Sequence, residues 1–351
     1  MNGYFALFYT AYPYYFPHFL PIYQELKKRG YGVHFVLSDK QNNTLMENIA
    51  KKYNLDYSFG EENLFRLSAD YVFFANHYEK AKDIKAKTVF LEHGIGTKST
   101  GFYKILEYID IYLVEGSYKY ERLKRLYPHL KDKLKVVGFS KFDPIVNINE
   151  KQKHSIYKKF GFDHKKKTIL YAPTFFPSSI EKMSNNFPGD FEDCNILIKA
   201  HYLTYERKQY KNQRKKLLKW GDFKNCVVVD VNEYDLVPLF TISDVLISDE
   251  SSAMFEFASL NKPVISNRYF KLRLSYYIMP WKLKKRIDNQ KDRYREILDN
   301  AYDYNETKKL VKEALLNPLK LESLRLKFSK ELCGIIDGNV SNRIVNIMEE
   351  L

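Results

Sequence analysis

One stretch of the sequence, residues 243–265, limits the possible folds more than any other: SDVLISDESSAMFEFASLNKPVI. It begins with a short apolar run that has the length and composition of a buried parallel strand. A polar turn and a helical pattern follow, and Asn261 is expected to end the helix. Pro263 then opens a second apolar run, where its missing N–H does least harm. This order predicts strand, turn, helix and strand, the unit from which parallel α/β sheets are built.

The turn of this unit holds two serines, Ser251 and Ser252, directly before the predicted helix. Serine is a favourable helix N-cap. A hydroxyl-rich turn at a helix N-terminus is also a favourable place for a phosphate group, because N–H groups and the helix dipole point toward it. Helix capping alone and phosphate binding are therefore two open interpretations of this turn.

The same alternation runs through the chain in two series, separated by a polar segment at 147–154. A helix at 17–29 with Gly30 as its C-cap joins the first two strands. Strands are expected at residues 4–9, 33–37, 71–75, 88–91, 111–115 and 135–138, and then at 168–172, 195–199, 226–230, 244–248 and 263–266. The sequence thus predicts an α/β fold with two doubly wound parallel-sheet halves and a ligand cleft between them. A polar loop at 177–190 is predicted to be a mobile lid, and residues 319–351 have a mostly helical pattern.

Charge and composition narrow the classes of function. The net charge is +14, and most of the excess lies after residue 150. Such a surface suits nucleic acid, anionic lipid or phosphate-rich substrates, and because no nucleic-acid-binding motif is present we expect no nucleic acid partner. The three cysteines lack metal-ligand spacing, so we expect buried thiols and no metal ion. No secretory signal or membrane-spanning run is evident, which predicts a cytoplasmic protein.

Reactive side chains follow five of the predicted strands. In a parallel sheet the residues just past the carboxyl ends of the strands form the ligand site. Here these residues are histidines, lysines, hydroxyls and one acid: His93, Lys141, Thr174, Lys199, His201, Asp249, Ser251 and Ser252. They supply hydrogen-bond donors for a diphosphate and a base for an incoming hydroxyl, which suits transfer of a phosphate or glycosyl phosphate.

Each histidine also has a simpler interpretation. His93 precedes Gly94, which lets the backbone approach a ligand closely, so catalysis is predicted; the alternative is a histidine held in a turn. His201 points to the same side as Lys199 in an extended chain, so both are expected at the site; the alternative is a solvated loop pair. His18, in the first turn of the 17–29 helix, either contacts an acceptor or is solvated.

Five blocks of the sequence, taken in order, resemble the CDP-glycerol glycerophosphotransferase family of teichoic-acid and capsule glycerol-phosphate transferases. They are EHGIGTKS (92–99), VVGFSKFD (136–143), YAPTF (171–175), IKAH (198–201) and ISDESSAMFEFASLNKPVI (247–265). The resemblance implies a GT-B fold with two Rossmann-like domains. Residues 1–148 would form the acceptor domain and residues 149–351 the nucleotide-donor domain, with a return of the last helix to the first domain left open.

The resemblance also implies roles for particular residues. His93 and His201 correspond to histidines that are essential in the family. Donor binding is expected from a larger set, in which Glu256 faces the ribose: Gly94, Thr97, Lys141, Thr174, Lys199, Asp249, Ser251, Ser252 and Glu256. The sequence departs from the family at Phe176, where an arginine is usual, and at Glu250, where a tyrosine is usual. Both departures make the donor pocket less cationic.

The implied function is transfer of a polyol phosphate, most simply glycerol phosphate, from a CDP-activated donor. The acceptor would be a hydroxyl of a lipid-linked glycan or a growing teichoic-acid or capsule polymer, and CMP would leave. No tightly bound cofactor is expected. Two alternatives stay open: a GT-B glycosyltransferase or UDP-sugar epimerase that uses a sugar nucleotide, and a non-catalytic scaffold of a capsule assembly complex.

Two segments that mix basic and aromatic residues, 206–220 and 269–286, are candidates for binding an anionic membrane surface. They suggest a peripheral protein on the inner face of the plasma membrane. The alternative is that both segments are solvated helix faces.

Overall fold

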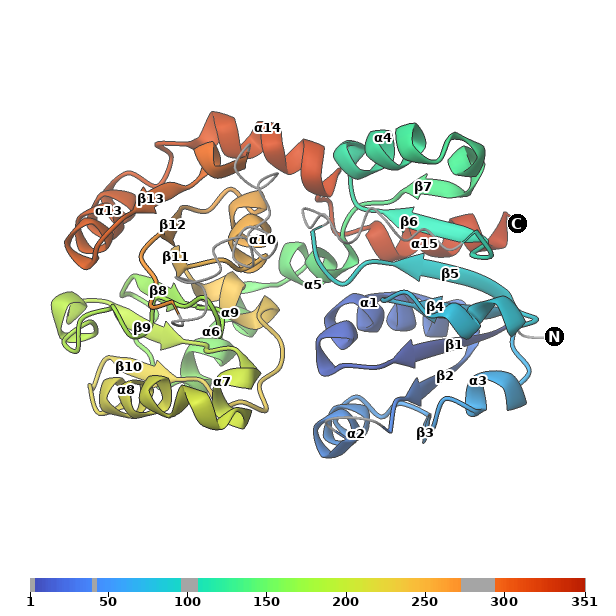
Figure 1. Ribbon diagram of the computed structural model, residues 1–351, viewed down its shortest axis with the longest axis horizontal. Helices are drawn as coiled ribbons and strands as arrows, with labels where there is room; N and C mark the ends of the chain where they lie inside the picture. Colours follow the sequence, from blue (N-terminus) through green and yellow to red (C-terminus); the bar gives the residue numbers. More distant parts are fainter. Residues whose placement is uncertain (1–3, 40–42, 96–106, 273–293, 351) are drawn as a thin grey trace. The chain divides into compact units, whose positions relative to one another are not determined.

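The computed structural model describes residues 4–39, 43–95, 107–272 and 294–350. The chain forms two compact units. Unit 1 contains Met1–Gly96, Thr100–Asn147 and Lys330–Leu351, and unit 2 contains Ile148–Ser329. Unit 1 is therefore built from both ends of the described chain, and each unit has its own sheet (Figure 1).

The sheet of unit 1 has the strand order β3-β2-β1-β4-β5-β6-β7 in the described part of the chain, and every neighbouring pair is parallel. Its strands are β1 (Phe5–Thr10), β2 (Gly32–Leu37), β3 (Tyr57–Phe59), β4 (Tyr71–Phe74), β5 (Lys87–Leu91), β6 (Ile111–Val114) and β7 (Leu134–Val136). Because parallel strands are covered on both faces, their side chains are mostly apolar. Phe8 shows this at the centre of the sheet, where its ring stacks on Phe35 and Phe73.

The C-terminal segment completes unit 1. Helix α15 (Val340–Glu349) packs against α1 (Phe16–Lys28) (Figure 1). The carboxylate of Asp143 accepts hydrogen bonds from the backbone N–H groups of Val340 and Ser341 at 3.0 and 2.8 Å. The hydroxyl of Tyr71 donates to the carbonyl of Met348 at 2.6 Å. The last helix therefore belongs to unit 1, the point that the sequence left open.

Unit 2 repeats the same topology. Its strand order is β10-β9-β8-β11-β12-β13 in the described residues, again with parallel neighbours. The strands are β8 (Thr168–Tyr171), β9 (Asn195–Ile198), β10 (Cys226–Val228), β11 (Val245–Ser248), β12 (Val264–Asn267) and β13 (Asp299–Ala301). The helices of this unit include α6 (Glu150–Lys159), α7 (Tyr202–Glu206), α8 (Lys211–Gly221), α9 (Val237–Ile242), α10 (Ala253–Ser259), α13 (Tyr304–Leu316) and most of α14 (Glu322–Cys333). Tyr171, Phe187 and Trp220 meet edge to face in its core.

The predicted α/β fold with two parallel sheets is confirmed, and the predicted strands are present with ends that shift by one or two residues. Gly30 and Asn261 follow α1 and α10 with φ angles of 84° and 57°, the left-handed conformation that ends a helix. The short strands β3 and β13 were not predicted.

One prediction about a loop is wrong, and one about a basic segment applies to fewer apolar residues than expected. The segment 177–190 is not a lid, because Ile180 and Phe187 are fully buried in the core of unit 2. In the basic segment 206–220, Tyr210, Leu217 and Trp220 are core residues, whereas Leu218 is exposed. Binding of this segment to a membrane stays a prediction. Residues 273–286 of the second basic segment lie outside the described residues.

Candidate functional site

The strand order fixes where ligands meet each unit. In both sheets the order reverses between two central strands, β1 and β4 in unit 1 and β8 and β11 in unit 2. Open parallel sheets bind ligands outside the carboxyl ends of the strands, at the point of this reversal. The loops that follow these strands and their neighbours are therefore the candidate site within each unit.

His93 lies after β5 and is fixed to the loop after β4. Its Nδ1 is 2.7 Å from the carbonyl oxygen of Ala75. A carbonyl only accepts hydrogen bonds, so Nδ1 carries the proton, and in the neutral ring the lone pair is on Nε2. The rings of Tyr14 and Tyr15, after β1, each lie 5.1 Å from the imidazole ring. His93 is thus held in the tautomer that a general base needs at Nε2.

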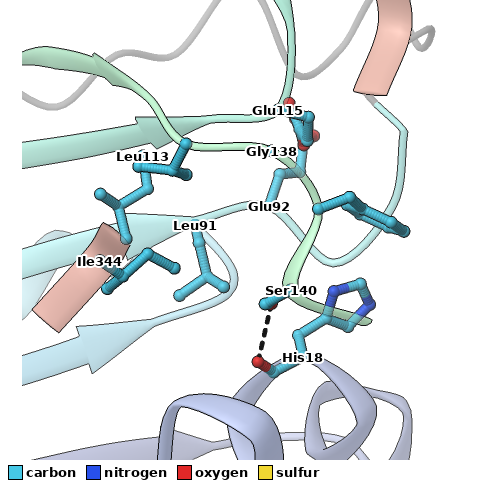
Figure 2. A pocket seen from close by; sticks show the side chains of 10 residues that line it. His18, Leu91, Glu92, Leu113, Glu115, Gly138, Ser140 and Ile344 are labelled. Carbon is cyan, nitrogen blue, oxygen red and sulfur yellow. Dashed lines mark hydrogen bonds between the residues drawn. The ribbon is translucent and has the colours of Figure 1, made fainter. Parts of the chain in front are cut away.

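A buried ion network lies beside His93. Lys119, on α4 (Ser117–Leu126), donates to the Glu92 carboxylate at 2.5 Å and to Glu115 at 3.3 Å. Burial raises the pKa of Glu115 to about 7, whereas Lys119 outweighs the effect of burial at Glu92 and lowers its pKa. Figure 2 shows both carboxylates at the wall of a small pocket that His18 and Ser140 also line. The network fixes the residue that directly precedes His93.

His18 is a buried residue and does not contact solvent. Only 1% of it is exposed, and its ring packs edge to face on Phe139. Burial lowers its pKa well below the ordinary value, and the nearby Lys141 adds to this effect. The Ser140 hydroxyl donates to the His18 carbonyl at 2.9 Å (Figure 2). The interpretations of His18 as an acceptor contact or a solvated residue are therefore both wrong; it joins α1 to the turn that carries Lys141.

The remaining predicted residues of unit 1 differ in exposure. Gly94 is half-buried directly after His93, and Lys141 is 7% exposed in the short 3-10 turn Ser140–Phe142. Thr97 lies outside the described residues.

In unit 2, His201 follows β9 and forms the N-cap of α7. Its Nδ1 accepts a hydrogen bond from the backbone N–H of Leu203 at 3.2 Å. The lone pair is therefore on Nδ1, and in the neutral ring Nε2 carries the proton. His201 is the opposite tautomer of His93: its Nε2 is a donor, whereas the Nε2 of His93 is an acceptor.

Lys199 stands two residues before His201 and is mostly buried. Its ammonium group donates to the carbonyl of Asp230 at 3.1 Å. Burial lowers its pKa to about 8, although Asp230 and Glu233 act in the opposite direction. A lysine in this environment is a cation that is only partly solvated, and such a group gains more from an anionic ligand than a fully hydrated one.

Asp249 was predicted to bind the donor, and the structure places it beneath the loop that follows β8. It is fully buried, and burial raises its pKa to about 7. Its carboxylate accepts from the backbone N–H groups of Thr174 and Ser179 at 2.6 and 3.0 Å, and from the hydroxyls of Ser178 and Ser179. Asp249 therefore shapes the loop, including Thr174, and does not face a ligand.

The serine turn before α10 is half-buried. The Ser251 hydroxyl accepts from the backbone N–H of Ala253 at 3.3 Å, whereas Ser252 stands at the N-cap position without a side-chain cap. Capping therefore accounts for Ser251 and leaves the Ser252 hydroxyl unexplained. Glu256 is 3% exposed in the first turn of the helix.

The effect of Glu250 on the charge of the pocket is smaller than the sequence suggested. Its carboxylate lies 2.9 Å from Arg295 and 3.3 Å from Arg268, so two arginines surround it. This group of three carries a net positive charge. Sequence reasoning missed both arginines, because nothing near them in the sequence marks them as partners of Glu250. The buried network of Glu92, Glu115 and Lys119 was missed for the same reason.

No group of three or more His, Cys, Asp or Glu side chains in the described part of the chain is arranged to hold a metal ion. None of the helices described has both the length and the apolar composition to cross a bilayer.

Two successive parallel-sheet units with reactive side chains after their strands define the GT-B class of transferase folds. The solved wall teichoic acid polymerase TagF has a similar fold, with a TM-score of 0.72 and 18% identity over 99% of this chain and 88% of that chain. The chain belongs to the CDP-glycerol:poly(glycerophosphate) glycerophosphotransferase family, whose model matches residues 8–350. The family that the sequence blocks resembled is therefore confirmed.

Curated relatives carry related names. The teichoic acid glycerol-phosphate primase of Bacillus subtilis (strain 168) is 27% identical over 251 residues, which cover 71% of this chain and 60% of the primase. The teichoic acid glycerol-phosphate transferase of Staphylococcus aureus (strain NCTC 8325 / PS 47) is 25% identical over 268 residues, 70% of this chain and 61% of that protein. The chain thus spans about three fifths of the length of these relatives.

Replacement of Asp249 tests whether it organises the loop that follows β8. Asp249→Ala leaves several buried donors without an acceptor, so we expect a loss of about 3 kcal/mol in the free energy of unfolding. Both tryptophans of the chain, Trp220 and Trp281, lie in the sequence of unit 2, so urea unfolding followed by tryptophan fluorescence reports on that unit. The control is Asp222→Ala at an exposed position, with an expected change within about 0.5 kcal/mol. Equal losses in both variants contradict the assignment.

Proposed function

We propose that the chain transfers glycerol phosphate from CDP-glycerol to a hydroxyl of a lipid-linked glycan or a growing cell-surface polymer, with release of CMP. The family supplies the chemical class of the reaction. The observation that carries the assignment of roles is the opposite polarity of two backbone hydrogen bonds, one at Nδ1 of His93 and the other at Nδ1 of His201.

His93 is the general base in this proposal. Its Nε2 accepts the proton of the acceptor hydroxyl, and the hydroxyl oxygen forms a bond to the β-phosphorus of CDP-glycerol. The bond from the β-phosphorus to the bridging oxygen breaks, and CMP leaves with that oxygen and its electron pair. The Glu92 carboxylate interacts electrostatically with His93 and favours the imidazolium that forms. Positioned proton transfer of this kind typically contributes 10²–10⁴-fold to a rate.

The residues that bind the phosphates of CDP-glycerol are assigned to unit 2. The Nε2–H of His201 and the ammonium of Lys199 donate to the diphosphate, where negative charge increases as CMP leaves. The hydroxyls of Ser251 and Ser252 and the loop at Thr174 add further donors, and Asp249 holds that loop from below. Glu256 is assigned to the ribose, and Gly94, Thr97 and Lys141 complete the proposed donor contacts. We propose no tightly bound cofactor or metal ion.

Glutamine substitutions separate the roles of the two histidines. The amide nitrogen of glutamine reaches the position of Nε2 and donates a hydrogen bond, but it does not accept a proton as a base does. We expect His93→Ala and His93→Gln to lower kcat equally, by about 100-fold or more. His201→Ala is expected to lower kcat by about 100-fold, and His201→Gln to recover at least about 10-fold of that loss. The measurement is CMP release from CDP-glycerol in the presence of a lipid-linked glycan.

The same assay distinguishes the alternatives. Full turnover by His93→Ala, or recovery by His93→Gln, contradicts the role of His93 as the base. Turnover with a UDP-sugar in place of CDP-glycerol points to a sugar-nucleotide enzyme. Failure to bind or convert any CDP or UDP donor points to a scaffold. Calorimetric titration with CDP is the control for each histidine variant, because loss of the base lowers turnover without lowering the affinity for the nucleotide.

Lys199 predicts a pH dependence of donor binding. With a pKa of about 8, its ammonium is charged below that pH and neutral above it. The affinity for CDP should therefore fall as pH rises, by about 10-fold between pH 8 and pH 9.3. Lys199→Arg keeps its charge throughout this range, so its affinity should stay constant. Calorimetry at several pH values checks this, and an equal loss in both proteins contradicts the role of Lys199.

The proposed location is the inner face of the plasma membrane, and the exposed side of α8 supports it. Lys211, Lys215 and Lys219 are exposed there beside Leu218, which is 73% exposed. In the described part of the chain, none of these three lysines has an acidic partner within 4.0 Å. Free ammonium groups around an apolar side chain suit an anionic headgroup layer, and each lysine near such a surface contributes about 1 kcal/mol.

Charge reversal tests this surface. The triple variant Lys211→Glu, Lys215→Glu and Lys219→Glu should bind phosphatidylglycerol vesicles about 100-fold more weakly in flotation assays, since three lysine contributions are lost. The matched control reverses three exposed lysines elsewhere in unit 2: Lys151, Lys158 and Lys165. Equal weakening by both triple variants, or no difference between phosphatidylglycerol and phosphatidylcholine vesicles, contradicts a specific role of α8.

A further inference from the structure

The two units have the same strand order but different chemistry where that order reverses. In unit 2 the loops after β8 and β11 present the hydroxyls of Thr174, Ser251 and Ser252. In unit 1 the segment after β1 contains Tyr12, Tyr14 and Tyr15. Hydroxyls suit phosphate oxygens, whereas aromatic rings suit a ligand with an apolar face. The two units therefore present surfaces for different parts of the reaction.

The tyrosines of unit 1 form one packed cluster. The rings of Tyr12 and Tyr14 are stacked, with centroids 5.1 Å apart and planes inclined by 9°. Tyr15 is buried and meets both of these rings edge to face, at 5.7 and 5.1 Å. Tyr12 and Tyr14 are half-buried, so the cluster has a fixed inner part and an accessible outer part. Pro13 starts the short 3-10 turn Pro13–Tyr15 and restricts the backbone that holds the rings.

The cluster is adjacent to the proposed base. The ring of Tyr14 lies 5.1 Å from that of His93, and the backbone after β4 holds His93 in this position. A hydroxyl that gives its proton to Nε2 must approach within about 3 Å of that atom. The group that carries the hydroxyl must therefore lie beside Tyr14.

Resting on the proposed function, we infer that the acceptor hydroxyl is carried by a sugar ring that packs against Tyr12 and Tyr14, and that these residues set the acceptor class. A pyranose presents a face of C–H groups, which packs on an aromatic ring, and a rim of hydroxyls, which bond to phenol oxygens. Tyrosine supplies both kinds of contact. An acyclic polyol phosphate has no such face and gains little from the rings.

Binding of small glycosides tests this inference without any turnover. The probes are methyl β-glycosides of a hexose and of an N-acetylhexosamine, with glycerol 3-phosphate as the acyclic comparator. Saturation-transfer NMR on the intact chain should show glycoside binding, with the strongest transfer to the protons of one ring face. Tyr12→Leu and Tyr14→Leu should each weaken glycoside binding by about 10-fold, equivalent to about 1.4 kcal/mol. Tyr14→Phe keeps the ring and should change the affinity by no more than about 3-fold.

The matched control is Tyr302→Leu, which removes a tyrosine of unit 2 that is 68% exposed and should leave glycoside binding unchanged. Glycoside binding that is absent, or that is equal in the wild type and the Leu variants, overturns the inference. So does tighter binding of glycerol 3-phosphate than of either glycoside at the same position.

Kinetics separate this inference from the proposed function. With sugar-terminated and glycerol-phosphate-terminated acceptors in turn, Tyr12→Leu should raise KM for the sugar-terminated acceptor by about 10-fold and leave KM for CDP-glycerol unchanged. A preference of the wild type for the glycerol-phosphate terminus overturns the acceptor assignment but leaves the transfer reaction in place. If the wild type does not bind CDP-glycerol, the proposed function is overturned, while the NMR result still decides whether the sugar site exists.

Discussion

Within each sheet the strands described are parallel to one another, and the arrangement of the site depends on this constraint. Parallel strands deliver every following loop to the same edge of the sheet, so residues far apart in sequence become neighbours. The hydrogen bond between His93 and Ala75 joins the loops of two adjacent strands in this way. The bonds from Thr174 and Ser179 to Asp249 do the same in unit 2. His93 and Thr174 are thus held by a loop from another strand, whereas His201 is held by the N–H of Leu203 in its own loop.

The backbone also decides which nitrogen of each histidine carries the proton. A carbonyl faces Nδ1 of His93 and an N–H group faces Nδ1 of His201, so identical side chains present opposite functions at Nε2. The burial of charge around these loops costs stability, as the raised pKa values of Glu115 and Asp249 indicate. Such a cost is common where a structure fixes reactive groups.

The sequence predicted the sheets well because buried parallel strands are continuous apolar runs with clear ends. Strand β13 was missed because its residues, Asp299, Asn300 and Ala301, have no such pattern. Positions of reactive residues after strands were also predictable, since His93 and His201 follow β5 and β9 directly. Asp249 is buried under its loop, and for the other predicted donor contacts an orientation toward the nucleotide stays a prediction.

Orientation and burial were less accessible to sequence reasoning. Asp249 stands in a polar turn like its serine neighbours, but its partners lie about 70 residues earlier in the chain. His18 is buried because Phe139, more than a hundred residues away, covers its ring. The network at Glu92 depends on Lys119, which lies on α4, between β6 and β7. Long-range partners of this kind decide burial and charge, and no local pattern identifies them.

The contribution of α15 to unit 1 has a consequence for biosynthesis. Residues 148–329 contain all strands of the second sheet, so this unit is complete as soon as they have left the ribosome. Unit 1 is complete only when Val340 and Ser341 have been made and bond to Asp143, and when Met348 bonds to Tyr71. The half that is translated first is therefore finished last, and its apolar surface near α1 stays uncovered until α15 has been made.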